Sequence, residues 1–187
     1  SIALASSCLK NGGIAILPTD TVYGFSGIVD VRGEKDLKTD EKIRLIKGRA
    51  EDKPLIQLIA SPSDIFLYTK QQVPEKLLSK WPGPLTIIVK IKEDSQLSTS
   101  LTSIAFRCPG DLWLRKVIAE CGRPIYSTSV NRSGFPVLQD FEEIKKEFEA
   151  EVDMIVSGTC TGGQPSTIVS LQSDGTIKIL RQGSLVL

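Results

Sequence analysis

The chain carries its densest group of cationic side chains in one short stretch, Lys47, Arg49 and Lys53. Like charges this close repel one another unless an anion lies between them. The simpler alternative is that they are solvated surface charges and that Lys47 complements the carbonyl end of a helix, an effect of ~0.3–1 kcal/mol. Because the stretch joins a helical pattern to an apolar strand, we predict that it holds an anionic group in the loop between them.

A second polar segment, residues 127–134 (STSVNRSG), follows an apolar pair. In an extended chain Ser127, Ser129 and Asn131 alternate onto one face, where they can donate together to phosphate or ribose. A strand-end turn with local Ser and Asn hydrogen bonds explains the segment equally well. The segment matches neither of the glycine-rich phosphate patterns, GxGxxG and GxxxxGK[ST], so its type of ligand stays open.

Further polar groups stand at the ends of apolar segments. Residues 18–24 (PTDTVYG) supply two threonine hydroxyls, a carboxylate and a phenol, although a simple turn in which Tyr23 packs would need no ligand. Arg107 and Arg181 each close an apolar strand, a position from which a guanidinium can bind a carboxylate or phosphate through two N–H groups. The residues therefore predict a pocket built from several loops.

The absence of histidine from the chain excludes Ser-His-Asp and Cys-His catalysis. No carboxylates are clustered at metal-ligand spacing, so we predict no metal held by the protein alone. Chemistry in this chain must depend on Lys, Arg, hydroxyl and backbone groups.

The overall composition is that of one globular domain, residues 1–187. With 23 basic and 22 acidic side chains, there is no overall excess of positive charge for coating a polyanion. No apolar run approaches the ~18 residues of a membrane span, so we expect a soluble, cytoplasmic protein that does not contact a membrane. The four cysteines form no CxxC pair, which favours reduced thiols in the cytosol; they are Cys8, Cys108, Cys121 and Cys160.

Helical and strand patterns alternate along the chain. Predicted helices cover 2–10, 40–48 with Asp40 as its cap, one or two segments within 63–80, 112–121 and 140–151. Predicted strands cover 14–17, 54–60, 85–91, 104–106 and 125–127, followed by a hairpin of 166–171 and 176–180 joined through Asp-Gly. This order predicts an α/β fold with a mixed sheet, and ligands in such folds collect at loops beyond the strand ends. Residues 157–166 are the best candidate for a mobile lid or connector.

From the residues alone, the prediction is an α/β domain with a cationic, hydroxyl-rich pocket for a nucleotide or another phosphorylated ligand. The pattern does not define a reaction.

Seven segments taken together resemble a known family: PTDTVYG, KGRxxxKPL, WPGPLT, IAFRCP, STSVNRSG, PSTIV and ILRQG. In this order, from about Gly13 to Gly183, they are similar to the YrdC-type threonylcarbamoyl-AMP synthases. The resemblance implies a twisted mixed parallel and antiparallel sheet flanked by helices, with a concave, positively charged groove. It also implies synthesis of L-threonylcarbamoyladenylate from L-threonine, bicarbonate and ATP, with release of pyrophosphate. That reaction is the first step of the N6-threonylcarbamoyladenosine (t6A) modification of tRNA.

The resemblance also implies roles for individual residues. Two of them, Lys47 and Arg49, would face the ATP phosphates and act in catalysis. On the threonine side it places Thr21, Tyr23, Arg107, Ser127 and Ser166. On the nucleotide side, besides Lys47 and Arg49, it places Lys53, Ser103, Ser129, Asn131 and Arg181. Mg²⁺ would be held mainly by the ATP phosphates.

The chain departs from the family pattern at three positions. Leu58 stands where many relatives have histidine, Lys53 where they have asparagine, and Val130 where they have alanine. The first two changes affect the expected recognition of threonine, and the third is a packing change. With its last residue at Leu187, the chain resembles the short form of the family, which passes its product to separate t6A-transfer proteins.

Two other functions remain open at this stage. One is a binding module for double-stranded RNA or tRNA, against which stands the lack of surplus basic charge and of aromatic stacking platforms. The other is a paralogue that keeps the pocket but acts on a different acyl or carbamoyl adenylate.

Overall fold

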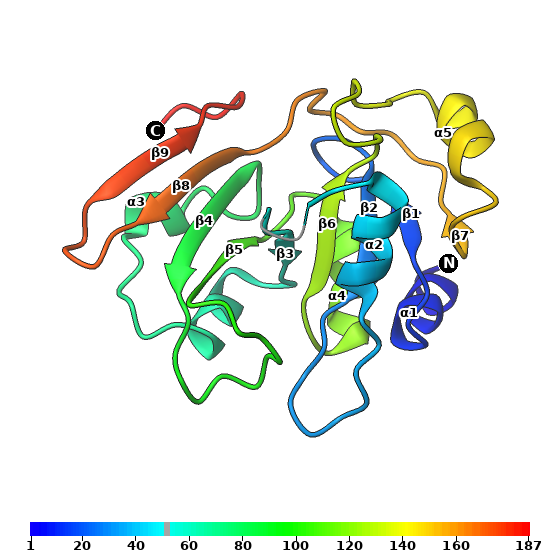
Figure 1. The fold of residues 1–187 in the computed structure, drawn as a ribbon. Helices are drawn as coiled ribbons and strands as arrows, with labels where there is room; N and C mark the ends of the chain where they lie inside the picture. The colour runs from blue at the N-terminus through cyan, green and yellow to red at the C-terminus, as the bar shows by residue number, and fades with distance from the viewer. Residues whose placement is uncertain (51–52) are drawn as a thin grey trace.

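The structure is a computed structural model that describes residues 1–50 and 53–187 (Figure 1). Its strands belong to one mixed sheet with the order β7-β1-β2-β6-β3-β5-β4-β8-β9. The strands are β1 (Ala15–Leu17), β2 (Gly24–Ile28), β3 (Ile56–Leu58), β4 (Leu85–Lys90), β5 (Ser103–Arg107), β6 (Ile125–Ser129), β7 (Met154–Ile155), β8 (Thr167–Leu171) and β9 (Ile177–Arg181). The expected α/β class is confirmed.

The sheet contains both parallel and antiparallel pairs. Strand β3 pairs parallel with β5 and antiparallel with β6, while β4 pairs antiparallel with β5 and parallel with β8. Strands β1 and β2 pair antiparallel, as do β2 and β6 and β8 and β9, and β7 joins the edge parallel to β1. Segments far apart in sequence therefore become neighbours around β3 and β6, where the predicted pocket residues lie.

The helices are α1 (Ile2–Lys10), α2 (Thr39–Lys47), the 3₁₀ helix η1 (Pro62–Leu67), α3 (Glu75–Leu78), α4 (Leu112–Cys121) and α5 (Phe141–Phe148). The prediction that Asp40 caps α2 is wrong. Lys38, at φ 53° and ψ 41°, is the N-cap, and Asp40 lies in the first turn. The acidic side chain still stands near the positive end of the helix, but it contributes charge and no capping hydrogen bond.

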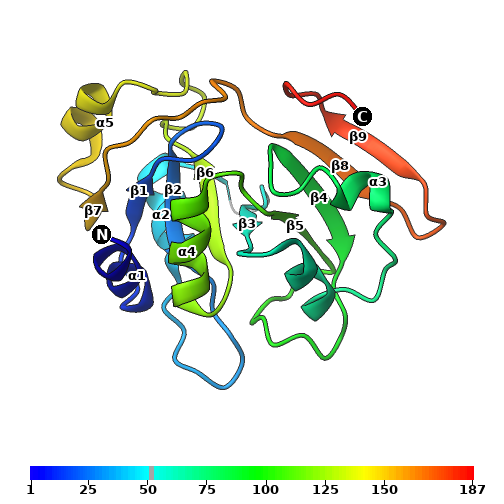
Figure 2. The same cartoon turned by 180° about the vertical axis from the view of Figure 1, so that it is seen from behind.

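Helices α2 and α4 cover opposite faces of the β2–β6 part of the sheet, with α2 in front in Figure 1 and α4 in front in Figure 2. Ile43 of α2 is buried with Phe25 of β2, whereas Leu114 of α4 is buried with Ile125 of β6. A third apolar cluster packs Leu77 of α3 against Phe106 of β5. The burial of alternating strand residues on two faces is what sets the register of each strand.

The sequence patterns did not predict two of the strands, and they predicted a third strand two residues too short. Strand β2 (GFSGI) and strand β7 (MI) lie in segments where no strand was expected, and β6 extends two residues farther than the predicted 125–127. Thr128 and Ser129 are thus strand residues like Ser127, and not members of a loop. Of the three residues expected to alternate onto one face, Ser127 and Ser129 lie in β6 and Asn131 lies beyond its end.

All four cysteines are free, with Cys108 and Cys121 buried and Cys8 and Cys160 partly so. Within residues 1–50 and 53–187, no helix combines the length and the apolar character needed to cross a membrane.

Candidate functional site

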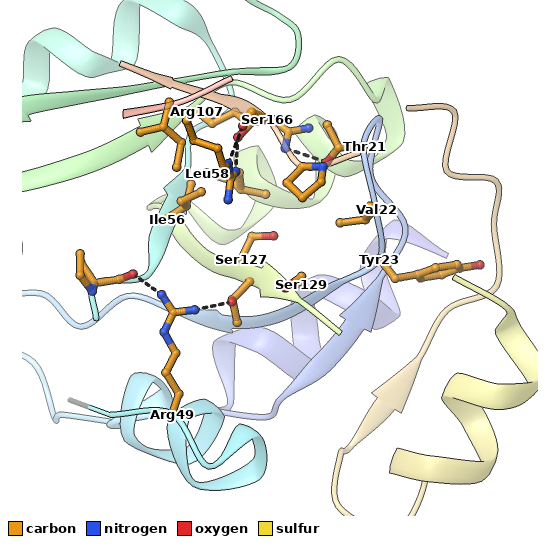
Figure 3. A pocket seen from close by; sticks show the side chains of 15 residues that line it. Thr21, Val22, Tyr23, Arg49, Ile56, Leu58, Arg107, Ser127, Ser129 and Ser166 are labelled. Atoms are coloured by element: carbon orange, nitrogen blue, oxygen red, sulfur yellow. Dashed lines mark hydrogen bonds between the residues drawn. The ribbon is translucent and has the colours of Figure 1, made fainter. Parts of the chain in front are cut away.

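Loops from several parts of the chain enclose a cavity of about 160 Å³, which we call the first cavity (Figure 3). Its walls come from the loop after β1, from β3, from the end of β6 and from the β8–β9 hairpin. The lining residues are Thr21, Val22, Tyr23, Arg49, Pro54, Ile56, Leu58, Arg107, Ser127, Thr128, Ser129, Pro165, Ser166, Ile168 and Arg181. The polar clusters predicted from sequence are thus brought together at one place.

Arg107 leaves the end of β5 and is 5% exposed. Its Nη1 donates to Thr21 Oγ1 at 2.9 Å, and its Nη2 forms an ion pair with Asp20. Burial lowers the pKa of Arg107, and the Asp20 carboxylate opposes that shift. Within the described chain its Nε has no hydrogen-bond partner. The guanidinium is therefore held in one orientation while part of its donor capacity stays unused.

The loop that follows β1 is organised by its own hydroxyl groups. Thr19 Oγ1 donates to Val22 O at 2.7 Å and accepts from Thr21 N at 3.0 Å, and it lies 2.9 Å from Thr21 Oγ1. Tyr23 lies at the edge of the cavity, but its hydroxyl points away and exchanges hydrogen bonds with the backbone of Gly158. The PTDTVYG loop is thus a turn held by its own hydrogen bonds, and the same loop contributes to the cavity wall.

The segment 157–166 lies against this loop. Thr161 Oγ1 donates to Asp20 O at 3.3 Å, and Gly163 N donates to Thr21 O at 3.1 Å. At Gly162 an added Cβ would lie 2.7 Å from Asp20 O, so the approach of the two backbones requires glycine. This segment thus packs against the loop that forms one wall of the cavity. Its mobility stays a prediction.

The β8–β9 hairpin contributes Ser166 and Arg181, which the sequence placed at corresponding ends of two paired strands. Arg181 Nε donates to Ser166 O at 2.9 Å, and its Nη2 donates to Ser166 Oγ at 3.3 Å. Ser166 Oγ also lies 2.7 Å from Thr86 Oγ1. Burial lowers the pKa of Arg181, and Arg107 and then Arg49 lower it further. The charges of Arg107 and Arg49 therefore act on Arg181 across the cavity.

Arg49 reaches the cavity from the loop after α2 (Figure 3). Its Nη1 donates to Thr128 Oγ1 at 3.0 Å and its Nη2 to Pro54 O at 2.9 Å. Burial lowers the pKa of Arg49, with a smaller contribution from Arg44. Because its partners are neutral, the positive charge of Arg49 is not neutralised by any described carboxylate.

Lys47 does not line the cavity. Its side chain is buried at the end of α2, where Nζ donates to Ser129 O, to Asn131 O at 3.1 Å and to Asn131 Oδ1 at 2.9 Å. The ammonium also stands 5.5 Å from the centre of the Phe25 ring. Burial, followed by Arg49, lowers the pKa of Lys47 to about 8. The lysine thus holds the end of β6, whose serines line the cavity.

Asn131 belongs to the same arrangement, since its Oδ1 accepts from Ser129 Oγ at 2.8 Å and its Nδ2 donates to Phe135 O. Lys53 is exposed and does not line the cavity. Ser103 is the first residue of β5 and Arg107 the last, so about 13 Å of extended chain separates them. Ser103 therefore lies outside this cavity as well.

Asp20 is the main residue of the site that the sequence did not single out, although it stands within the PTDTVYG segment. No described residue that lines the first cavity is acidic, and Asp20 stands behind it, in contact with Arg107. Three guanidinium groups and one carboxylate leave an excess of positive charge. The arrangement is suited to bind a multivalent anion beside hydroxyl groups.

Comparison with known proteins gives one family and several close structures. A family model described as "Telomere recombination" (Sua5, YciO, YrdC) matches residues 7–183. The threonylcarbamoyl-AMP synthase of Bacillus subtilis is 33% identical over 192 residues, covering 98% of this chain and 54% of the relative. That of Photobacterium profundum is 30% identical over 186 residues, covering 95% of this chain and 96% of the relative.

Among solved structures, the chain is similar to Pyrococcus abyssi Sua5 complexed with L-threonine, with a TM-score of 0.83 and 29% identity. The match covers 98% of this chain and 54% of that one. The chain thus spans about half the length of the B. subtilis and P. abyssi relatives.

Proposed function

Because the chain belongs to the Sua5, YciO and YrdC family, we propose that it makes L-threonylcarbamoyladenylate from L-threonine, bicarbonate and ATP, with release of pyrophosphate. The observation that carries this proposal is the set of three arginines, with Arg107 buried, Arg49 half-buried and Arg181 exposed, around one hydroxyl-lined cavity. Relatives named threonylcarbamoyl-AMP synthase, and one structure with L-threonine bound, support the choice of substrate.

The reaction suits a site without a protein nucleophile. The amine of threonine adds to carbon dioxide derived from bicarbonate and loses a proton, giving a carbamate. A carbamate oxygen then attacks the α-phosphorus of ATP, and the bond from that phosphorus to the bridging oxygen of pyrophosphate breaks. The protein needs only to align the two reactants and to stabilise the charge that develops on the phosphate oxygens.

The geometry supports a division of the first cavity into two ends. Arg107 and its neighbours Thr21, Ser127 and Ser166 would bind threonine. Arg49, Arg181 and Ser129 would bind the nucleotide. Lys47 and Asn131 would act by holding Ser129, and Tyr23 by supporting the threonine end through Gly158. Contacts from Lys53 and Ser103 would lie on parts of ATP that extend beyond the cavity.

Mg²⁺ fits this site only as the magnesium complex of ATP. In the part of the chain that the structure describes, no group of three or more His, Cys, Asp or Glu side chains is placed to hold a metal. Asp20 is the carboxylate nearest the arginines and is already paired with Arg107. The ion would therefore be bound by phosphate oxygens and water, and would neutralise charge on the triphosphate.

In this proposal the product serves as the first intermediate of tRNA t6A modification, in the cytoplasm, and passes to separate transfer proteins. The assigned residues bind threonine and ATP, so the reaction itself requires no contact between the chain and tRNA.

The proposal is tested by incubating the chain with ATP, Mg²⁺, bicarbonate and labelled amino acids while pyrophosphate release is followed. We expect release that requires both L-threonine and bicarbonate, with labelled threonylcarbamoyladenylate as the product. Release that is indifferent to threonine would indicate a paralogue with another substrate. No release from a folded chain would contradict the proposal.

Arg49→Ala is the sharpest variant for the nucleotide end. Loss of one charge-assisted hydrogen bond of ~1.5–3 kcal/mol should lower turnover roughly tenfold to a hundredfold. The matched control is Arg32→Ala, since Arg32 is an arginine outside the first cavity whose Nη1 donates to Glu93 O. Turnover of Arg49→Ala at the rate of the control, measured by pyrophosphate release, would show that Arg49 is misassigned.

A further inference from the structure

We propose that a second cavity, on the other face of the sheet from the first, binds a nucleobase through the side-chain amide of Gln57. This cavity has a volume of about 630 Å³ and lies between α2, the segment 98–101, β3 and β6. The proposal goes beyond the synthase reaction and does not depend on it.

The alternation of side chains along β3 separates the two cavities. Ile56 and Leu58 line the first cavity, whereas Leu55 and Gln57 line the second. Successive side chains of a strand point to opposite faces, so the second cavity is not an extension of the first. Tyr126 of β6, which pairs with Gln57, lines the second cavity, and Ser127, the next residue, lines the first.

Gln57 carries the argument for a ligand. Its side chain is 3% exposed, and among the described residues its Oε1 has no hydrogen-bond partner. A buried polar atom left without a partner costs roughly 1–3 kcal/mol of stability, which is why such groups in proteins nearly always have one. An unpaired amide oxygen on the wall of a cavity is therefore explained by a ligand that supplies the partner.

The chemistry of an amide limits what that partner is. A carboxamide presents one acceptor beside two donors, and it pairs with a planar edge that carries a donor next to an acceptor. The amino group and adjacent ring nitrogen of adenine form such an edge, and glutamine is one of the two side chains that recognise it in this way. Because the orientation of an amide can be reversed, the same side chain serves either order of donor and acceptor.

The other walls fit the rest of a nucleoside. Leu55 and the Tyr126 ring provide apolar surfaces for a flat base, and Ser98, Thr99 and Ser100 bring hydroxyls to the rim, suited to a ribose. Burial, followed by the charges of Asp40 and Asp30, raises the pKa of Tyr126, so its phenol stays a hydrogen-bond donor. The volume is several times that of the first cavity and accommodates a base with its sugar.

Charge distinguishes the ligand of the second cavity from that of the first. Asp40 and Glu41 line it together with Arg44 and Arg49, so the formal charges of its wall cancel. A neutral wall gives no advantage to a phosphate, in contrast to the three arginines of the first cavity. The second cavity should thus bind a nucleoside about as tightly as its monophosphate.

Arg49 lines both cavities and connects them. Its Nη atoms donate to Thr128 and Pro54, and its Nε has no described partner. A base bound beside Gln57 would contact the same side chain that faces the first cavity. By thermodynamic reciprocity, any effect of the nucleoside on ATP affinity must be matched by an equal effect of ATP on nucleoside affinity.

The test is calorimetric titration of the folded chain with adenosine, with AMP and with purine riboside, which has the same rings as adenosine but lacks the amino group. We expect saturable binding of adenosine and AMP with similar affinity. The affinity for purine riboside should be lower than that for adenosine by about tenfold or more. Gln57→Met keeps the volume and removes the amide, so it should weaken adenosine about tenfold or more. Arg181→Met, which alters only the first cavity, should leave adenosine binding unchanged.

Leu101→Trp provides a second variant, because Leu101 is half-exposed at the rim and its replacement narrows the entrance without disturbing the core. It should also weaken adenosine. The proposal is overturned if the folded wild-type chain does not bind adenosine, or if adenosine binds Gln57→Met and Leu101→Trp as it binds the wild type. Loss of adenosine binding in Arg181→Met alone would assign it to the first cavity and overturn the proposal as well. Pyrophosphate release by wild type and Gln57→Met is the separate measurement that reports on the synthase proposal.

Discussion

At the scale of single residues, the ion pair between Asp20 and Arg107 stands at the end of the first cavity that we propose binds threonine. Both side chains are largely withdrawn from water, with 14% of Asp20 and 6% of Arg107 exposed. Removing one partner of a buried pair leaves an uncompensated charge, which typically costs ~3–5 kcal/mol. A carboxylate at position 20 thus positions Arg107 and also makes its burial tolerable.

We expect Asp20→Ala to lower the free energy of unfolding by about 3 kcal/mol, and Asp20→Asn to lower it less, because the amide oxygen still accepts from Arg107. Urea unfolding of the two variants measures the difference. In the Asn variant, which stays folded, KM for threonine should rise while KM for ATP stays near that of the wild type. Equal changes in both constants would mean that Asp20 only stabilises the fold.

The ammonium of Lys47 gives stability a dependence on pH. Its pKa is lowered to about 8 in the folded chain, from ~10.4 for an unperturbed lysine. Between these two values the unfolded chain binds more protons than the folded chain, so stability rises with pH in this window. The gain is present above pH 10.4 and is lost as pH falls through 8.

Lys47→Met removes this titration while keeping most of the buried volume. The free energy of unfolding of the wild type should therefore increase relative to the variant between pH 8 and 10, by on the order of 1–3 kcal/mol. Denaturant unfolding of both proteins across this range measures the gap. A gap that is constant with pH would show that hydrogen bonds to Ser129 and Asn131 hold the ammonium charged. Because Lys47 is buried, a turnover defect in Lys47→Ala would combine the loss of its charge with the loss of its packing.

At the scale of elements, the sequence predicted helices and strands best where the pattern of a segment fits only one type of structure. Helix α4 has the predicted bounds, Leu112–Cys121, because its apolar spacing is regular, Asp111 caps it and Gly122 ends it. Strand β2 was not predicted because GFSGI is rich in glycine, which is depleted in strands. Its glycines are needed for a tertiary reason that no local pattern reveals.

Gly27 shows that reason. A Cβ added there would lie 2.6 Å from Thr39 Cβ, at the start of α2, and 3.1 Å from Ile14. Thr39 cannot yield easily, since it is fully buried and its hydroxyl donates to Ile28 O at 2.6 Å. Helix α2 leads into the Lys47 and Arg49 segment, so the close packing of α2 on β2 helps to place the cationic residues.

Gly27→Ala should therefore destabilise the chain by roughly 1–3 kcal/mol through overpacking, and should reduce turnover if α2 shifts. The comparison is Gly122→Ala, at φ 71° with no neighbouring atom within 4 Å, which adds backbone strain without a clash. Thermal unfolding of both variants separates the two effects. Activity that is lowered in Gly27→Ala and unchanged in Gly122→Ala would link the packing of α2 to the site, whereas equal activity would exclude that link.

The same limit explains which of the predicted residues line the first cavity and which do not. Thr21, Arg107, Ser166 and Arg181 stand at strand ends or beside them, Ser127 lies within β6, and the sheet brings all of them to the first cavity. Ser103 stands at the opposite end of its strand from Arg107, and Lys47 turns inward to carbonyl groups. Nearness along the chain or within a motif does not give the direction of a side chain, which depends on tertiary packing.

At the scale of the whole molecule, the first cavity is assembled from parts that the chain order keeps apart. Arg49 follows α2, Arg107 ends β5 and Arg181 ends β9, and they meet because β6, β3, β5, β4 and β8 are neighbours in one sheet. Each arginine is bonded to a residue of another segment: Arg49 to Thr128, Arg107 to Asp20 and Arg181 to Ser166. An anion that contacts all three arginines would link the segments that carry them.

Hydrogen exchange provides a test of this connection. Binding of magnesium-ATP should slow amide exchange together in the end of β6 and in the β8–β9 hairpin, because Arg49 and Arg181 hold the same triphosphate. The effect follows from mass action: a ligand at a hundred times its Kd raises the free energy of opening by ~2.7 kcal/mol in the segments that it bridges. Mass-spectrometric exchange measures each segment separately. In Arg49→Ala at the same ATP concentration, protection should fall in both segments, since the bridge needs both arginines. Protection that persists in the hairpin alone would mean that the nucleotide is held by one side of the cavity, and that the three charges do not act as one site.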